Sequence, residues 1–347
     1  MCIIRKIPNK SVLMITIFMY AFVISLITLI IVIYLSHKHD YFIDSSHHDK
    51  PQNFHESCTP RSGGFGIFAG MMIFLMTSIG IKLLLPALLA FLSGIFEDFH
   101  NSLSVRRRLF LQIIAALIAV LFLDTVVTYL GLGISMPYWL GVGFSVFAIV
   151  GMMNAINIID GFNGLASGTI LLILTSFAIT TYQHNNFEML SVIIVVLGST
   201  LGLFVLVFPK GKIFLGDGGA YLLGFIVAII GIFLASKYDG VSPWYILSIL
   251  IYPVWEVIFS IIRKLSIGLS PMKPDAYHFH MLVHRQISYK NNPLTALIIL
   301  LFIMPFMIVS TMYANCSICN IKIAGVFVLC YTLLYLYLFK KEKQNTN

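Results

Sequence analysis

Long apolar runs separated by short polar segments recur along the whole chain. Each run is about 20 residues long, which is the length that an α-helix needs to cross a bilayer. The runs predict helices near residues 12–35, 64–80, 82–97, 108–130, 137–157, 164–182, 189–208, 218–236, 243–263, 294–313 and 321–339. The pattern therefore predicts an all-α, polytopic integral membrane bundle of about eleven transmembrane helices, forming a single domain over residues 1–347.

One polar stretch stands out against this apolar background. It begins at Asn154 and continues through Asn157, Asp160, Gly161 and Asn163, between two of the predicted spans. The spacing of three residues puts the first three polar side chains on one broad face of a helix. Polar groups at membrane depth are costly unless they face protein or a wet cavity. Taken alone, the stretch fits a polar helix end with glycine turns as well as it fits a site.

The composition excludes an ordinary soluble protein. The chain is 59% hydrophobic and 10% charged, whereas soluble domains carry about 25% charged residues. The first apolar run, residues 12–35, is too long for a signal-peptide core and is predicted to be a retained span. The net charge of +8 is better explained by membrane topology than by nucleic-acid binding.

The charges fall mainly on one side of the predicted bundle. If the loop 36–62 lies inside, most of the 22 Lys and Arg residues lie inside as well. The positive-inside rule then predicts an outside N-terminus and a cytoplasmic C-terminus. Nearly all histidines and the acids of the polar loops share this side. Transporters tend to place ionisable groups near the midplane, so this layout favours an enzyme at the cytoplasmic face. A polytopic carrier of a phosphorylated metabolite or lipid is the alternative.

Carboxylates in two of the inside loops suggest a divalent cation. Glu97 and Asp98 are adjacent at the end of a predicted helix, where the helix dipole is already negative. Bound Mg²⁺ or Mn²⁺ would offset this repulsion, since both prefer oxygen ligands. Asp217 precedes a predicted helix and is followed by two glycines. It fits an ordinary N-cap and a metal or phosphate site equally well.

Basic residues in two further inside loops suit phosphate groups. Arg61 lies in a turn shaped by proline and glycine, where its forked donors could hold a phosphate, although a solvated turn explains it too. The spacing of His278 and His280 does not make a helical zinc face. Beside Arg285, these histidines suit diphosphate binding and proton handling. The loops together predict phosphoryl transfer at the membrane surface.

Two other features leave their interpretation open. Glu256 precedes Arg263 by two helical turns in the span 243–263, either as a buried structural pair or as part of the site. The five cysteines make no disulfide framework. The single CxxC pair, Cys316 and Cys319, is better explained as incidental than as a zinc or redox motif.

Five motifs in a fixed order carry a resemblance to a known family. They are Thr59-Pro60-Arg61-x-Gly63-Gly64, Glu97-Asp98, Asn154-x-x-Asn157-x-x-Asp160-Gly161, Phe214-Leu215-Gly216-Asp217 and Asp275-x-x-His278-x-His280. With them, the whole chain resembles the polyprenyl-phosphate N-acetylhexosamine-1-phosphate transferases, in the sugar-transferase branch. The phospho-MurNAc-pentapeptide branch fits less well.

The resemblance implies a reaction in the bacterial plasma membrane. A UDP-N-acetylhexosamine would give its sugar 1-phosphate to undecaprenyl or another polyprenyl phosphate, with release of UMP. This step would initiate a surface polysaccharide such as an O-antigen, a capsule or a teichoic-type glycan. Direct attack by the lipid phosphate is favoured over a covalent aspartyl intermediate, because that phosphate is already negatively charged near neutral pH. No nucleic acid is expected as a partner, and a homo-oligomer is left open.

The resemblance also implies roles for particular residues. It makes Asp217 the main Mg²⁺ ligand, with Asp98 near the metal or acting as a base. The full set of implied catalytic residues is Glu97, Asp98, Asp160 and Asp217, and the implied substrate-binding residues are Arg61, Asn154, Asn157, Gly161, Asn163, Phe214, His278, His280 and Arg285. Phe214 would stack on uracil. The chain departs from the family pattern at Glu97, Asn163, Glu256 and Met281, which is expected to affect the choice of sugar more than the reaction.

Overall fold

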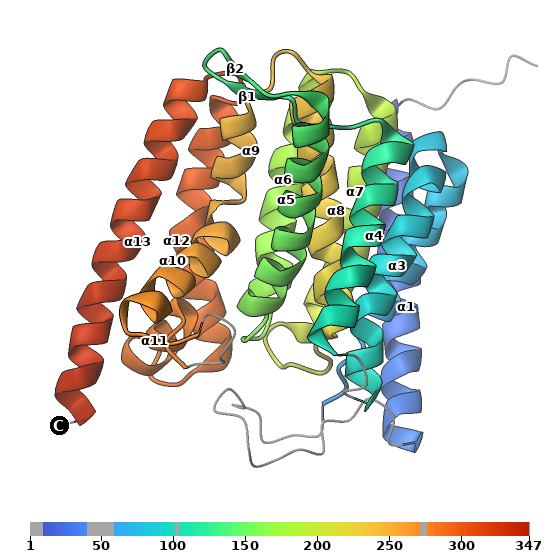
Figure 1. The fold of residues 1–347 in the computed structure, drawn as a ribbon. Coiled ribbons are helices and arrows are strands. Elements are labelled where there is room, and N and C mark those ends of the chain that lie inside the picture. Colours follow the sequence, from blue (N-terminus) through green and yellow to red (C-terminus); the bar gives the residue numbers. More distant parts are fainter. Residues whose placement is uncertain (1–9, 40–58, 101–103, 271–275, 347) are drawn as a thin grey trace, which may run out of the picture.

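The computed structural model describes residues 10–39, 59–100, 104–270 and 276–346 and shows a bundle of helices (Figure 1). The helices are α1 (Lys10–His39), α2 (Gly64–Met71), the 3₁₀ helix η1 (Met72–Met76), α3 (Ser78–His100), α4 (Val105–Leu123), α5 (Tyr138–Ile159), α6 (Leu165–Gln183), α7 (Phe187–Val207), α8 (Gly216–Lys237), α9 (Pro243–Ile249), α10 (Ile251–Ser266), α11 (Phe279–Gln286), α12 (Asn292–Met312) and α13 (Ser317–Thr346). A short antiparallel hairpin of β1 (Tyr129–Gly131) and β2 (Ile134–Ser135) connects α4 to α5.

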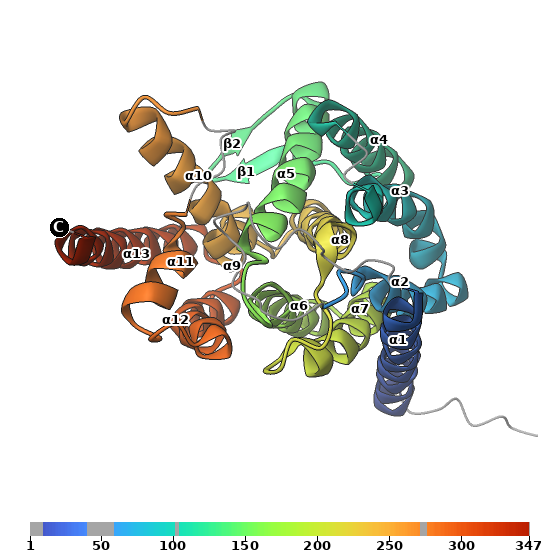
Figure 2. The same ribbon diagram turned by 90° about the horizontal axis from the view of Figure 1, so that it is seen from below.

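Helix α8 forms the centre of the bundle. Helices α3, α5 and α6 lie around it (Figure 2), and its residues from Gly218 to Leu234 are all buried. The sequence of α8 is apolar or small on every face, as expected for a helix with protein all round it. Neighbouring helices approach it closely: a Cβ on Gly94 of α3 would lie 2.4 Å from the Gly218 nitrogen, and a Cβ on Gly224 would lie 2.6 Å from the Met153 Cα of α5.

The prediction of a polytopic helical bundle is confirmed, and the structure is nearly all-helical apart from the short β1–β2 hairpin. In the part of the chain that the structure describes, eight helices are long and apolar enough to cross a membrane, and α9 with α10 would make a ninth. The predicted span near 108–130 falls on α4, whose first turn carries three arginines, and the one near 64–80 falls on the short segment Gly64–Met76. The count of eleven spans therefore stays a prediction.

The ninth predicted helix is broken rather than continuous. Helices α9 and α10 meet at an angle of 76°. Pro253, in the first turn of α10, has no N–H to donate to the carbonyl group of Ile249, where α9 ends. The proline therefore explains the position of the break, which hydropathy alone did not predict.

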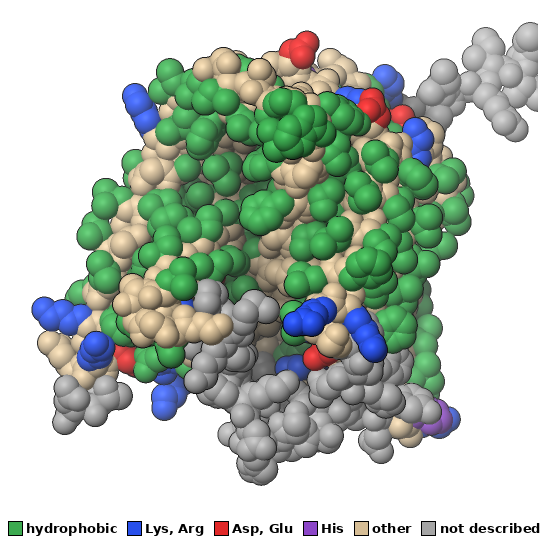
Figure 3. Space-filling view, in the orientation of Figure 1, with side chains coloured by type: hydrophobic (Ala, Val, Ile, Leu, Met, Phe, Trp, Pro, Cys, Tyr) green, Lys and Arg blue, Asp and Glu red, His purple; other side chains and the backbone are tan. Residues whose placement is uncertain are grey.

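The two ends of the bundle differ. At one end lie the β1–β2 hairpin and the α12–α13 connection, and at the other lie α11 and the connections from α5 to α6 and from α7 to α8 (Figure 1). We call these the hairpin end and the α11 end. Helix α1 begins at the hairpin end and α13 finishes at the α11 end. Figure 3 shows hydrophobic side chains over the middle of one face, with Lys and Arg towards its two ends, which is the distribution expected of a membrane-embedded bundle.

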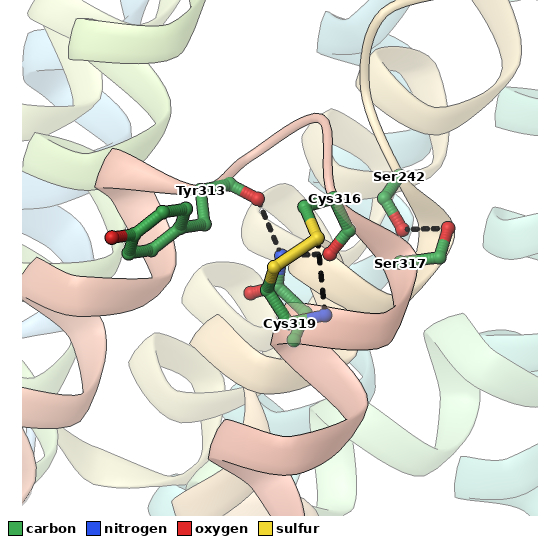
Figure 4. The surroundings of a disulfide bond; sticks show 6 residues. Ser242, Tyr313, Cys316, Ser317 and Cys319 are labelled. Carbon is green, nitrogen blue, oxygen red and sulfur yellow. Dashed lines mark hydrogen bonds between the residues drawn. A yellow bond between two sulfur atoms is a disulfide. The ribbon is translucent and has the colours of Figure 1, made fainter.

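One cysteine pair differs from expectation. At the hairpin end, Cys316 and Cys319 are joined by a disulfide (Figure 4). The turn into α13 brings their Cα atoms to 5.3 Å, within the range that a disulfide requires. There is still no framework of several bridges among the described cysteines, but the interpretation of the CxxC pair as incidental has to be corrected.

Candidate active site

Asp98, at the end of α3, caps the N-terminus of α8. Its Oδ1 accepts a hydrogen bond from the backbone N–H of Asp217 and its Oδ2 accepts one from that of Gly218, both at 2.9 Å. The end of α3 carries a negative dipole, and the start of α8 supplies unpaired N–H donors and a positive dipole. The Asp98 carboxylate is therefore stabilised by the helix that carries Asp217.

The glycine before Asp217 makes this contact sterically feasible. Gly216 has φ +74°, and a Cβ there would lie 2.7 Å from the Arg61 carbonyl oxygen and 2.9 Å from Asp98 Oδ2. A side chain at this position would have to displace the cap, and its backbone would be strained. Gly216 is thus required by the local geometry, which explains its place in the Phe214-Leu215-Gly216-Asp217 motif.

Asp217 is held by residues from two other helices. Its Oδ1 accepts a hydrogen bond of 2.9 Å from Asn157 Nδ2 on α5. Its Oδ2 lies 3.5 Å from Arg108 Nη1 on α4, and the same nitrogen lies 3.7 Å from Glu97 Oε2. Four predicted site residues, Glu97, Asp98, Asn157 and Asp217, therefore meet at the start of α8. Arg108 joins them and was not predicted as a site residue.

Asp160 extends this acidic cluster. It is the C-cap residue of α5, one helical turn beyond Asn157. Burial, followed by the negative charge of Asp217, raises the pKa of Asp160 to about 7, while the charge of Arg61 lowers it. Two neighbouring carboxyl groups repel each other when both are ionised, so the cluster favours a bound cation or a proton.

Two of the predicted loops lie side by side. The backbone N–H of Phe214 donates to the Pro60 carbonyl oxygen at 2.9 Å, and that of Gly63 donates to the Phe214 carbonyl oxygen at 2.8 Å. Arg61 and Phe214 form an isolated parallel bridge. The Arg61 turn is thereby attached directly to the segment that leads into Asp217.

His280 connects the α11 loop to the polar stretch after α5. A Cβ on Gly161 would lie 3.5 Å from the His280 ring and 3.8 Å from Met281 Cε, and the Phe162 ring centroid is 5.7 Å from that of His280. His280 is buried, and among the described residues its Nδ1 has no hydrogen-bond partner. Desolvation by burial lowers its pKa to about 4, opposed by the charge of Glu256. His280 is therefore neutral near pH 7.

Three predicted binding residues have other partners. Asn154 Nδ2 donates to Gln112 Oε1 at 2.9 Å and to the Val150 carbonyl oxygen at 2.8 Å. Asn163 Nδ2 donates to the Pro209 carbonyl oxygen at 3.0 Å. Arg285 Nε donates to Glu342 Oε1 at 2.6 Å. These contacts are structural, and the substrate-binding roles of the three residues stay predictions.

His278 belongs to a different environment from His280. Its ring stacks on that of His280, with centroids 5.4 Å apart, but its Nδ1 lies 3.0 Å from Glu256 Oε1. Glu256 therefore pairs with His278 and not, as the sequence had suggested as one option, with Arg263. The predicted motif residue Asp275 lies outside the described residues.

The acidic cluster can be tested for its fit to a divalent cation. Among the residues that the structure describes, no three or more His, Cys, Asp or Glu side chains are grouped to hold a metal ion. Mg²⁺, however, is usually bound by one or two carboxylates together with substrate phosphates. A carboxylate has about four acceptor positions, and each Asp98 oxygen uses one for a backbone N–H. Asp217 and Asp98 therefore fit a magnesium site that the substrate completes.

Comparison with known proteins identifies a family that the chain resembles. A family model described as glycosyl transferase family 4 matches residues 80–235, a range that holds α3 to α8 with the acidic cluster. Over this range the chain is similar to that family. The family 4 match does not include Arg61, His278, His280 or Arg285, whose assignment rests on the sequence motifs and the geometry above.

Individual relatives carry the names of both branches considered in the sequence analysis. A Bacillus subtilis (strain 168) protein described as a "probable undecaprenyl-phosphate N-acetylglucosaminyl 1-phosphate transferase" is 29% identical over 290 residues, which cover 78% of this chain and 77% of that protein. Phospho-N-acetylmuramoyl-pentapeptide-transferases are similar too. The one from Streptococcus sanguinis (strain SK36) is 28% identical over 286 residues, covering 75% of this chain and 86% of the relative. The one from Streptococcus pneumoniae (strain CGSP14) is 29% identical over 272 residues, covering 71% and 80%. The resemblance found in the sequence is thus confirmed at the level of the family.

Proposed function

We propose that this chain is a family 4 glycosyl transferase that moves an N-acetylhexosamine 1-phosphate from a UDP-sugar to polyprenyl phosphate. The observation that carries the proposal is the meeting of Asp98 and Asp217, from two different helices, at the N-terminus of α8. Asn157 and Arg108 hold Asp217 in place there. A helix N-terminus with carboxylates around it suits a diphosphate together with a divalent cation, and the names of the relatives describe transfer of a sugar 1-phosphate or a phospho-sugar.

The proposed chemistry is a phosphoryl transfer between two phosphates. An oxygen of the lipid phosphate forms a bond to the sugar-bearing phosphorus, the bond from that phosphorus to the UMP oxygen breaks, and UMP leaves. Asp217 and Asp98 would hold Mg²⁺ or Mn²⁺, which screens the negative charges of the phosphates when bound. Arg108 and Arg61 add positive charge at the same place. Little covalent chemistry is asked of the protein, because positioning and charge stabilisation supply most of the rate.

The remaining site residues are assigned to the two ends of the donor. Phe214 would stack on uracil, with Asn157, Asp160 and Gly161 forming the adjoining floor. The neutral His280 beside Gly161 would donate a hydrogen bond to the diphosphate or the sugar. The position of this region at one end of the bundle lets an acceptor phosphate reach it from the membrane surface while the prenyl chain stays in the bilayer.

The proposed location is the bacterial plasma membrane with the site on the cytoplasmic side. Arg61, Arg108, Arg263 and Arg285 all lie towards the α11 end, on or beside the helix ends found there. The positive-inside rule then puts this end in the cytoplasm, where UDP-sugars are made. The product would start a surface polysaccharide.

The test is a transfer assay in membranes that contain the full chain. Radiolabelled UDP-GlcNAc, UDP-GalNAc, UDP-N-acetylfucosamine and UDP-MurNAc-pentapeptide are supplied one at a time with undecaprenyl phosphate. We expect one UDP-amino sugar to yield a chloroform-soluble product with equimolar UMP. Formation of this product would also distinguish an enzyme from a carrier, which would release none. If no donor gives a product while a control enzyme is active, the proposal is refuted. Activity with UDP-MurNAc-pentapeptide alone would assign the protein to the phospho-MurNAc-pentapeptide branch.

One pair of variants tests the metal site. Asp217→Asn should lower the transfer rate by at least ~100-fold, since loss of a metal-orienting group alone costs about 10–100-fold. Asp239→Asn is the matched control, because Asp239 is an exposed acid beyond the other end of α8. Equal activity of the two variants would remove Asp217 from the site.

A further inference from the structure

The Cys316–Cys319 disulfide lies at the hairpin end, opposite the candidate active site. It joins the connection after α12 to the first turn of α13 (Figure 4). Both cysteines are partly exposed. They are therefore accessible to a reagent from solution, and the transferase chemistry proposed above makes no use of them.

Cys316 is the N-cap residue of α13. Its carbonyl oxygen accepts the first helical hydrogen bond from the Asn320 N–H at 3.1 Å, and its Sγ accepts a hydrogen bond from the Cys319 N–H at 3.2 Å. The start of a long helix also has a positive dipole end. Both features stabilise negative charge on sulfur, and such surroundings activate cysteines in CxxC motifs.

Neighbouring contacts fix this corner to α9. Ser317 Oγ and Ser242 Oγ are hydrogen-bonded at 2.9 Å, and the Ser242 N–H donates to the Ala314 carbonyl oxygen at 2.9 Å. Asn320 Nδ2 donates to the carbonyl oxygens of Tyr313 and Cys316 at 2.7 and 3.0 Å. The turn is thus held by hydrogen bonds that do not depend on the disulfide. Its sulfurs can be reduced without loss of the turn.

We propose that Cys316 and Cys319 form a thiol–disulfide exchange site on the extracytoplasmic face, with Cys316 as the reactive sulfur. The partner is a protein or small molecule that carries a dithiol or a disulfide. Disulfides persist outside the cytoplasm and are kept reduced within it. The bond therefore agrees with the orientation proposed from the charges, on which this inference rests.

The exchange balances as a two-electron step. A partner thiolate attacks Cys319 Sγ, the bond between the two Sγ atoms breaks, and Cys316 leaves as a thiolate that the Cys319 N–H stabilises. The partner's second thiolate attacks the mixed disulfide at the partner sulfur, and Cys319 leaves. Two electrons and two protons pass to the cysteine pair, and the partner dithiol becomes a disulfide. A partner disulfide restores the bond: the Cys316 thiolate attacks one partner sulfur and the other partner sulfur leaves, and the Cys319 thiolate then attacks Cys316 Sγ and releases the partner as a dithiol.

The test counts accessible thiols on intact cells. The full chain carries Cys2→Ser, Cys58→Ser and Cys330→Ser, so that only the pair can react. Cells are treated with a membrane-impermeant maleimide-polyethylene glycol, with or without prior exposure to an impermeant phosphine reductant. We expect no adduct without reductant, two adducts after it, and renewed protection once the reductant is replaced by oxidised glutathione.

Two single-cysteine variants test the role of Cys316. In the same background, the Cys319→Ser variant should be alkylated several-fold faster near pH 7 than the Cys316→Ser variant, because only the former keeps its thiol at the N-cap. Total labelling after denaturation in detergent normalises the amounts of protein. Equal rates, or a faster Cys319, would overturn the assignment of the reactive sulfur.

Other outcomes contradict the exchange site itself. Two adducts without reductant would show a free dithiol. Adducts that form only after permeabilisation would put the pair in the cytoplasm. Failure of oxidised glutathione to re-form the disulfide would exclude reversible exchange. All these readouts are independent of sugar transfer. A failed labelling test therefore leaves the proposed function standing, and a failed transfer assay leaves the exchange site standing.

Discussion

Glu256 connects the histidine loop to the bundle, and its hydrogen bonds allow a quantitative prediction. The side chain is 1% exposed. Its Oε1 lies 3.0 Å from both His278 Nδ1 and the Phe279 backbone nitrogen, and its Oε2 accepts a hydrogen bond of 2.9 Å from Tyr331 Oη on α13. Both oxygens face donor groups, as expected of an ionised carboxylate. Three elements, α10, α11 and α13, therefore depend on one buried charge.

The free energy of the Tyr331–Glu256 hydrogen bond depends on whether Glu256 is charged. A neutral hydrogen bond between membrane helices contributes about 0.6 kcal/mol on average, and one to a charged group contributes about 1.5–3 kcal/mol. Tyr331→Phe should therefore lower the free energy of unfolding by about 1.5–3 kcal/mol. Glu256→Gln keeps an acceptor for Phe279 and can donate to the rotated Tyr331 hydroxyl. A double-mutant cycle of these two changes isolates the part due to charge, about 1–2 kcal/mol.

Glu256→Ala is the severe member of the series. It leaves His278, the Phe279 N–H and the Tyr331 hydroxyl without an acceptor, and each buried donor left unpaired costs about 1–3 kcal/mol. If the loop holds the donor as proposed, the same change should raise the donor KM more than it lowers kcat. Glu256→Gln should leave KM closer to its original value.

The assay is reversible unfolding in mixed micelles, followed by tryptophan fluorescence, to which Trp255 beside Glu256 contributes. Tyr337→Phe is the matched control, because Tyr337 lies on the same helix and is 64% exposed. A Tyr331→Phe effect no larger than that of the control would refute the reasoning. A coupling energy near zero in the cycle would show that the Glu256 carboxyl group is neutral.

Three further predictions concern the site. Gly216→Ala should lower the free energy of unfolding by more than the ~1–2 kcal/mol of left-handed backbone strain. Gly133→Ala is the control: Gly133 has φ +79° and nothing within 4 Å of an added Cβ, so this change should cost only the strain. Equal shifts in melting temperature would contradict the steric argument. Asn163→Asp should lose the hydrogen bond to the Pro209 carbonyl oxygen and lower the free energy of unfolding by roughly 1–3 kcal/mol. The preferred donor in the UDP-sugar panel should not change. A changed preference in a stable protein would show that Asn163 faces the donor. Asp160→Asn should stabilise the cation-free protein more at pH 8 than at pH 4, in thermal melts across this range. The folded-state pKa of Asp160, about 7, lies above its unfolded value of about 3.9. The carboxyl group therefore destabilises the fold progressively as the pH rises from about 4 to about 7, and by a constant amount above that; a stabilisation that is equal at both pH values would contradict this cause.

The sequence predicted the helices well and the broken span poorly. Nearly every long apolar run forms a helix, because about 20 apolar residues must satisfy their backbone hydrogen bonds internally. Hydropathy averages over a window and does not register one missing donor, so the break near Pro253 between α9 and α10 was read as a continuous helix. The proline itself was a usable signal, since it removes the hydrogen bond to Ile249.

The candidate site shows a similar division. The motifs predicted which loops would meet, and the structure joins Arg61 to Phe214 and Asp98 to Asp217. The sequence did not distinguish Arg108 from Arg106 and Arg107, because a residue's position along a helix does not show how deeply its side chain is buried. The structure makes the distinction: Arg106 and Arg107 are exposed, and Arg108 is partly buried beside Asp217.

Asp98 shows why the choice between a structural and a catalytic role was not available from the sequence. A carboxylate at the end of one helix and a second at the start of another can each be an ordinary cap or a metal ligand. In the structure Asp98 is the cap, but it caps α8 rather than α3, and each of its oxygens accepts one N–H, which leaves further acceptor positions. The cap holds the Asp98 carboxyl group next to Asp217, and it leaves acceptor positions for a cation. The two roles therefore support each other, and the glycine at position 216 is what allows both.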